Sequence, residues 1–213
     1  MKTDDLISML STGVAPVDPN FASKRFQIAL AGGSAMALLV LAALYGINPH
    51  LRDAAMLPMF WAKFAFPAAL LLAGLLLTVR VSTPGRPWKA SAKSVLLPLL
   101  AMFLLATVVL LNAAPQERLP LVLGKTWTVC AASIAVVSSP VLLAAFWAVR
   151  GLAPTQLRLA GASAGLLAGG LGAVIYALHC PEMAAPFIAV WYTAGILLTS
   201  ALGALLGPRL LRW

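Results

Sequence analysis

The sequence predicts an all-α fold: an integral membrane bundle of six transmembrane helices with a short cytoplasmic N-terminal leader. Hydrophobic residues make up 62% of the 213-residue chain and charged residues only 10%, whereas a soluble domain carries about 25% charged residues. The apolar residues gather in six stretches, each of about 20 residues, the length of a helix that crosses a bilayer. Such stretches must satisfy their own backbone hydrogen bonds in lipid, and this favours helices.

The predicted spans divide the chain into three parts. They cover residues 26–47, 60–79, 95–114, 127–149, 159–178 and 187–206. The parts are a leader over residues 1–25, a transmembrane domain over 26–207 and a tail over 208–213. No loop between the spans is long enough to fold alone. A soluble partner would therefore have to bind the leader, the basic loop 80–93, or both.

The basic residues predict that both chain termini lie in the cytoplasm. Of the 15 Lys and Arg residues, eleven fall on the side of the termini, three (Arg52, Arg118 and Lys125) fall on the opposite side, and Lys63 lies within a span. Positively charged loops remain in the cytoplasm. Because these residues cluster in short loops between spans, the formal charge of +9 indicates contact with anionic lipid headgroups and not with nucleic acid.

Small residues recur at every fourth position in the fifth and sixth predicted spans. They include Gly161, Gly165 and Gly169 in the fifth span and Gly195, Thr199 and Gly203 in the sixth. Stripes of this kind let helix backbones approach closely in lipid. Packing within one bundle and a homodimer face are the two alternatives, and the longest glycine stripe predicts that the fifth span is the central helix.

The leader is predicted to contain a short amphipathic helix followed by a proline-containing tether. Thr3 can cap this helix, and Asp4 and Asp5 fall in its first turn, where negative charge is favourable. Leu6, Ile7 and Leu10 then share one face. This face could bind an apolar groove of a partner. The alternative is a helix that lies on the membrane surface.

Both cysteines and both histidines map to the outer side of the predicted topology. Cys130 opens the fourth span, and Cys180 lies in the loop His179-Cys180-Pro181-Glu182. The cysteines could form a disulfide if their Cα atoms approach to about 4.4–6.8 Å. Thiolates and imidazoles also bind soft metals, which makes a loose metal site from Cys130, Cys180, His179 and Glu182 with His50 an alternative. In a third interpretation, Cys130 is a core residue and the others are ordinary loop residues.

Lys63 is the only charged residue deep within a predicted span. Charges inside a membrane are costly and often functional. Because Lys63 lies about one turn from the outer end of its span, its ammonium could instead reach the interface or pair with a nearby group.

Three short motifs resemble the NrsF family of negative regulators of an extracytoplasmic-function (ECF) sigma factor, sigma-F, which are six-span membrane anti-sigma factors. The motifs are the start Met1-Lys2-Thr3-Asp4-Asp5-Leu6-Ile7, the stretch Phe60-Trp61-Ala62-Lys63, and the loop His179-Cys180-Pro181-Glu182 paired with Cys130. They occur in the expected order over the whole chain. One departure is Thr83-Pro84-Gly85, where the family has Arg-Pro-Gly.

The resemblance implies a regulator in the bacterial inner membrane, not an enzyme. Its leader would bind an ECF sigma factor and hold it away from RNA polymerase. Cys130 and Cys180 would sense heavy metal or oxidant on the outer side, and their modification would release the sigma factor. No resident cofactor is expected, and a heavy-metal ion would bind only transiently as the signal.

Two other functions fit a small helical membrane protein. A small transporter would carry polar residues along a central path and broken helices near the midplane. A passive membrane tether would bind a partner without sensing. A thiol oxidoreductase is disfavoured because the chain has no CxxC motif.

Overall fold

The computed structural model describes residues 3–12, 20–83, 85 and 87–212. Within these residues the chain is helical and forms no strand, which confirms the all-α prediction. Six segments are long and apolar enough to cross a membrane: Phe21–Leu44, Pro58–Ser82, Lys89–Asn112, Pro115–Arg150, Leu157–Tyr176 and Ala185–Leu210. The architecture is that of a multi-pass membrane protein. The predicted tether at residues 14–19, the first two residues, Pro84 and Trp213 lie outside the described residues.

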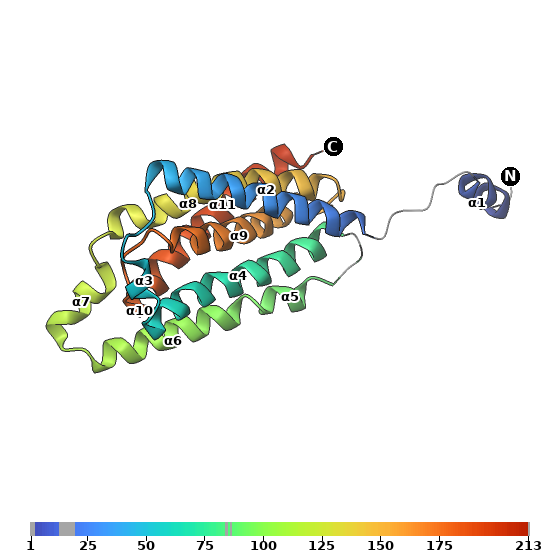
Figure 1. Cartoon of the computed structure of the whole chain (residues 1–213). Coiled ribbons are helices and arrows are strands. Elements are labelled where there is room, and N and C mark those ends of the chain that lie inside the picture. Colours follow the sequence, from blue (N-terminus) through green and yellow to red (C-terminus); the bar gives the residue numbers. More distant parts are fainter. Residues whose placement is uncertain (1–2, 13–19, 84, 86, 213) are drawn as a thin grey trace.

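Six long helices form the bundle, and Figure 1 shows how they are arranged. They are α2 (Phe21–Leu44), α4 (Pro58–Ser82), α6 (Leu96–Asn112), α8 (Trp127–Arg150), α9 (Leu157–Tyr176) and α11 (Thr193–Leu210). The shorter elements are α1 (Thr3–Ser11), α3 (Leu51–Ala54), α5 (Lys89–Lys93), α7 (Pro115–Leu123), α10 (Ala185–Phe187) and the π-helical segment η1 (Ile188–Tyr192).

Some helices extend beyond the apolar stretches that predicted them, whereas α6 (Leu96–Asn112) is shorter than its predicted span 95–114. α2 begins at Phe21, five residues before the predicted span, and includes the charged Lys24 and Arg25. α11 continues to Leu210, beyond the predicted end at residue 206. Hydropathy marks the part of a helix that lies in hydrocarbon, whereas the helix itself continues as long as its backbone hydrogen bonds do.

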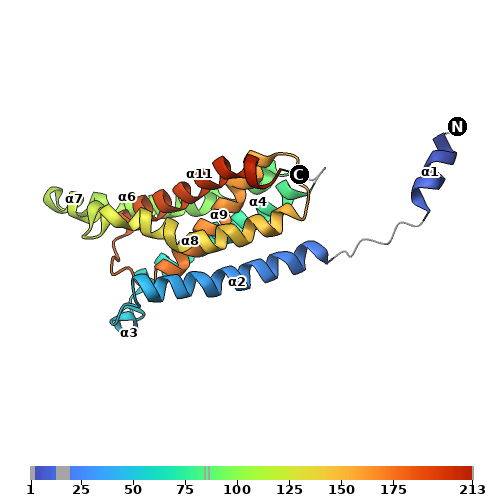
Figure 2. The same cartoon turned by 90° about the horizontal axis from the view of Figure 1, so that it is seen from above.

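The connections between the long helices lie at two ends of the bundle. We call the end where α2 begins and α11 finishes the termini end, and the opposite end the far end. α3, α7 and α10 all lie at the far end (Figures 1 and 2). α3 carries Arg52 and α7 carries Arg118. These two arginines therefore lie at the end of the bundle opposite the start of α2, as predicted.

The central helix is α9, as the glycine pattern predicted. It packs against α4, α8 and α11 (Figure 2). Most residues of α9 are buried, whereas in α6 only Met102 and Ala106 are buried. α9 therefore forms the middle of the bundle, and α6 presents most of its surface to the lipid.

The glycine stripes of α9 and α11 pack against each other within one chain. A Cβ atom added to Gly165 would lie 2.5 Å from the Thr199 carbonyl oxygen, and one added to Gly161 would collide with the Gly203 carbonyl oxygen. At these positions any side chain would separate the two backbones. The small residues therefore serve packing within the bundle, the first of the two predicted alternatives.

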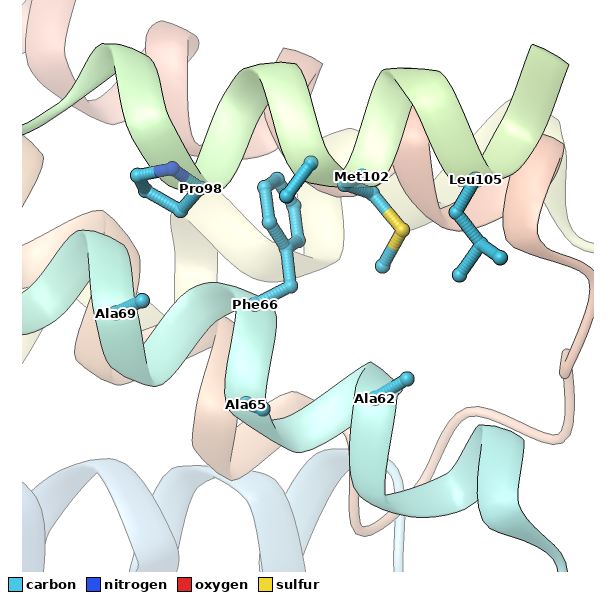
Figure 3. Close-up of a pocket in the computed structure, with 8 residues that line it drawn as sticks. Ala62, Ala65, Phe66, Ala69, Pro98, Met102 and Leu105 are labelled. Atoms are coloured by element: carbon cyan, nitrogen blue, oxygen red, sulfur yellow. The ribbon is translucent and has the colours of Figure 1, made fainter. Parts of the chain in front are cut away.

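An apolar cavity of about 250 Å³ lies between α4 and α6 (Figure 3). It is lined by Ala62, Ala65, Phe66, Ala69, Pro98, Ala101, Met102 and Leu105. None of these side chains carries a charge or a hydrogen-bonding group. The cavity therefore suits acyl chains or packing side chains, and it has no group that would orient a polar ligand.

Candidate functional site

The two cysteines lie together at the far end of the bundle. Cys130 belongs to the first turn of α8, and Cys180 lies in the loop that follows α9. Both are free thiols, with exposed fractions of 0% for Cys130 and 1% for Cys180. Their side chains hydrogen-bond to each other. The structure therefore brings together the pair that the sequence placed on one side, in a setting closed to bulk water.

Turns at the end of α9 position Cys180. The backbone N–H groups of His179 and Cys180 both donate to the carbonyl of Tyr176, at N···O distances of 3.0 and 3.1 Å. The N–H of Asn48, in the connection after α2, donates to the Leu178 carbonyl at 3.1 Å. The loop is thus fixed to α9 on one side and to the α2–α3 connection on the other.

Glu182 joins this loop to the start of α8. One carboxylate oxygen accepts a hydrogen bond from the backbone N–H of Lys125 at 2.7 Å and lies 3.5 Å from the Thr126 hydroxyl. Gly124 completes the turn with a φ of +57°, and a Cβ atom there would lie 2.8 Å from the Glu182 carboxylate. Glu182 therefore holds the turn before α8, and with it Cys130, beside the Cys180 loop.

The surroundings of His179 and His50 differ from those of the two cysteines. The Nδ1 atom of His179 is 3.2 Å from the Gly46 carbonyl oxygen, and its ring lies 5.4 Å from that of Tyr45 and 5.7 Å from that of Tyr176, between ring centroids. His50 is exposed and lies 3.9 Å from the Asp53 carboxylate.

Within the described residues no three His, Cys, Asp or Glu side chains are arranged to hold a metal ion. Of the four predicted site residues, the structure joins Cys130 to Cys180 and places Glu182 beside them, with His179 turned toward Tyr45. The two thiols are the members of the predicted set that hydrogen-bond to each other.

Lys63 is part of this site, although the sequence did not assign it there. Its side chain is 0% exposed, and its Nζ donates a hydrogen bond to the backbone carbonyl of Cys180. The ammonium therefore does not reach the interface, and the pairing alternative is the one observed. A lone lysine in an apolar span was the sequence signal, but only the packing of α4 against the loop identifies its partner.

Two tyrosines close the site from within the bundle. Tyr176 and Tyr192 are almost fully buried, and their ring centroids are 6.2 Å apart. The Tyr192 hydroxyl has no oxygen or nitrogen partner among the described residues, and it approaches the Cys180 thiol. No sequence pattern pointed to these residues, because tyrosines near span ends are common at membrane interfaces.

The surroundings of Cys180 lower the pKa of its thiol. The largest cause is the hydrogen bond with Cys130, and the charge of Lys63, the Glu182 N–H and the Tyr192 hydroxyl add to it. Burial acts in the opposite direction, because it disfavours the charged thiolate. Cys180 is therefore prepared to act as the nucleophile of the pair.

A second contact joins α2 and α8 at the termini end. The guanidinium of Arg25 lies 4.0 Å from the centroid of the Trp147 ring and donates to the Trp147 carbonyl at 2.6 Å. A Cβ atom at Gly151 would lie 2.5 Å from this guanidinium. We call this contact the Arg25–Trp147 clamp. α8 therefore runs from Cys130 at the far end to the clamp near the start of α2.

The predicted leader helix exists as α1 and lies apart from the bundle (Figure 1). Its apolar residues are exposed, with fractions of 41% for Leu6, 59% for Ile7 and 68% for Leu10. Asp4 and Asp5 fall in its first turn, as predicted. The structure thus supplies an amphipathic helix whose apolar face is uncovered within the described chain.

Comparisons with known proteins give one consistent result. A sequence model of the family described as "Negative regulator of sigma F" (NrsF) matches residues 10–213. The chain is 44% identical to a protein of Azospira oryzae named "Probable anti-sigma-F factor NrsF", over 213 residues and the full length of both. It is 38% identical to the "Anti-sigma-F factor NrsF" of Caulobacter vibrioides, again over the full length of both. No solved structure matches the chain.

Proposed function

The chain belongs to the NrsF family of negative regulators of sigma F, and from this premise we propose that it is a membrane-bound anti-sigma factor. It binds an ECF sigma factor through its N-terminal leader and keeps it at the inner membrane, away from RNA polymerase. The full-length similarity to two proteins named anti-sigma-F factors carries this proposal. The protein acts by binding and catalyses no reaction.

The leader helix α1 is the proposed docking element. Leu6, Ile7 and Leu10 are the apolar anchors, and Asp4 and Asp5 add negative charge at one end. A nine-residue helix is too short to be stable alone in water, where about 12–15 residues are needed. Binding in a groove of the sigma factor would stabilise it, and the ordering required makes each contact weaker than that of a preformed helix.

Cys130 and Cys180 are the proposed sensors of heavy metal or oxidant. Because the two thiols are buried in contact with each other, adding a metal ion or a covalent bond must change the packing between the Cys180 loop and α8. A heavy-metal ion would act as a transient signal and not as a resident cofactor.

Signal and sigma factor must be coupled through two states of the bundle. A coupling free energy of about 1–3 kcal/mol is typical and changes occupancy about 5–150-fold. We propose that α8 carries this coupling, because it holds Cys130 at one end and Trp147 at the other. Arg25 then links the moving helix to the base of the leader.

The proposed orientation places both termini in the cytoplasm and the far end on the outer side. It is supported by the excess of Lys and Arg at the termini end. An alkaline phosphatase fusion, which is active only outside the cytoplasm, should be active when joined near Pro181 and inactive when joined after the last residue. Activity of the C-terminal fusion would contradict the orientation and the sensor function together.

The function is tested by purifying the tagged full-length protein from detergent-solubilised membranes and identifying bound proteins by mass spectrometry. An ECF sigma factor should be present in preparations from untreated cells. It should be depleted after the cells are exposed to cadmium or dichromate. Preparations that contain no sigma factor before treatment would refute the proposal.

A further inference from the structure

Lys63 places a positive charge beside Cys130 and Cys180, and we call these three residues the thiol site. It is the one charged side chain that is fully buried among the described residues. Its Nζ binds the backbone carbonyl of Cys180, and the titratable groups that act on it electrostatically are Cys180, Cys130 and Glu182. An ammonium in low dielectric attracts anions and repels cations more strongly than a surface charge does.

The positive charge of Lys63 is not cancelled by an ion pair. Within the described residues no carboxylate lies within salt-bridge distance of Nζ. Glu182 is the nearest candidate, and its carboxylate is bound to the Lys125 N–H and faces the Thr126 hydroxyl. While both thiols are protonated, the Lys63 ammonium is therefore the dominant charge at the two sulfur atoms, where it acts more strongly than the Glu182 carboxylate does.

We propose that Lys63 determines which reagents the thiol pair accepts: the site reacts faster with anionic and neutral thiol-modifying agents than with cationic ones. This inference deepens the proposed function and takes its physiological meaning from it. It implies that, among the proposed signals, anionic and neutral oxidants reach the thiols faster than hydrated metal cations do. Lys63 is thus a specificity-determining residue that acts through its charge.

The reaction that tests the inference is thiol–disulfide exchange with a small disulfide, RSSR. The Cys180 thiolate attacks one sulfur of RSSR, the reagent's S–S bond breaks, and RS⁻ leaves and takes up the proton lost by Cys180. Cys130 then attacks the Cys180 sulfur of the mixed disulfide and releases a second RSH. The protein dithiol is oxidised to a disulfide, and one RSSR is reduced to two RSH.

Three disulfides of similar size and different charge serve as probes. They are 3,3′-dithiodipropionate, a dianion, bis(2-hydroxyethyl) disulfide, which is neutral, and cystamine, a dication. The purified full-length protein in detergent is treated with each probe, and Cys180 modification is followed by mass spectrometry. Each charged probe's rate is divided by the rate of the neutral probe, so that differences in access or folding cancel.

The native protein should react with the dianion at least about tenfold faster than with the dication, after correction for their reactions with a free model thiol. Lys63→Gln, whose amide can still donate to the Cys180 carbonyl, and Lys63→Met should both reduce this ratio toward one. Lys63→Arg, which keeps the positive charge, should retain the preference for the dianion. Lys125→Met is the matched control, because the Lys125 side chain is exposed and its contact with Glu182 is made by the backbone N–H.

The inference is overturned if the native protein shows no preference for the dianion, if Lys63→Gln and Lys63→Met retain the preference, or if none of the probes reacts. A failure of the proposed function would appear elsewhere, as normal induction of a sigma-factor reporter in cells that carry Cys180→Ser. The ratio of the reaction rates of the anionic and cationic probes is measured without the sigma factor. The two results are therefore independent.

Discussion

The thiol site and the leader helix have opposite environments. Cys130, Cys180 and Lys63 are at most 1% exposed, and their polar contacts are made within the chain. In α1, by contrast, none of the residues is buried. The polar contacts of the thiol site are thus made within the chain, whereas the apolar face of the leader is uncovered. The proposed function would use this division, with the signal received inside the bundle and passed to another molecule through the leader.

The contrast predicts that a larger side chain destabilises the protein when it is placed inside the bundle and not when it is placed on the leader. Gly165→Leu should destabilise the bundle by about 3 kcal/mol, because the new side chain meets the α11 backbone. Ser8→Leu, on the exposed leader, should leave stability unchanged. The measurement is the fraction of detergent-solubilised protein that stays monodisperse after heating. Equal heat resistance of both variants would contradict the packing of α9 against α11.

The contrast also predicts that charge on the leader abolishes partner binding without affecting the bundle. In the double variant Leu6→Asp, Leu10→Asp two of the three apolar anchors are lost, each with about 1.5–3 kcal/mol of burial. Co-purification of the sigma factor should fall more than a hundredfold, and target genes should become constitutively expressed. Ser8→Asp lies on the other side of the helix and should behave as the native protein. Unchanged co-purification of the double variant would remove α1 as the docking element.

At the thiol site, the prediction is loss of induction with retained repression. Cys130→Ser, Cys180→Ser and the double variant should have similar effects, because the two thiols act as one unit. Repression should survive, because α1 is untouched and serine is nearly isosteric. A reporter of sigma-factor activity measures repression in untreated cells and induction in treated cells. Normal induction by cadmium and dichromate in the double variant, at native protein levels, would leave the cysteines with a packing role only.

The smallest effect is expected at the Arg25–Trp147 clamp, which connects the two regions. Arg25→Ala removes a cation–π contact of about 0.5–2 kcal/mol and one hydrogen bond. Induction should be reduced a few-fold, while the reactivity of Cys180 in the purified protein stays unchanged. Arg158→Ala, an exposed arginine of α9, is the control. A parallel loss of Cys180 reactivity would show that Arg25 supports folding and does not serve coupling.

The sequence predicted the features that depend on composition and local spacing. The six spans follow from apolar stretches of bilayer length, and the central place of α9 follows from Gly161, Gly165 and Gly169. The amphipathic α1 follows from the spacing of its apolar residues. Each of these signals lies within one segment, so no knowledge of the tertiary structure was needed.

The composition of the thiol site could be predicted only in part, because it is assembled from distant segments. Cys130 and Cys180 were placed on one side, but their contact depends on how α8 packs against α9. The position of Lys63 in its span was known, whereas the direction of its side chain was not. The contact of His179 with the Gly46 carbonyl also joins residues far apart in the chain. Such long-range contacts leave no pattern in a single sequence.

The close approach of α9 and α11 has a mechanical consequence. Glycines on both helices bring the two backbones into direct contact, so neither helix can slide past the other without a collision. The pair forms a fixed frame, and Cys180 is attached to it at the end of α9. Cys130 belongs to α8, whose Ile134 side chain meets Gly195 of α11 and whose Ser138 meets Gly172 of α9. A bond formed between the two sulfurs would therefore shift α8 against this frame, and the displacement would arrive at the other end of α8 beside Trp147.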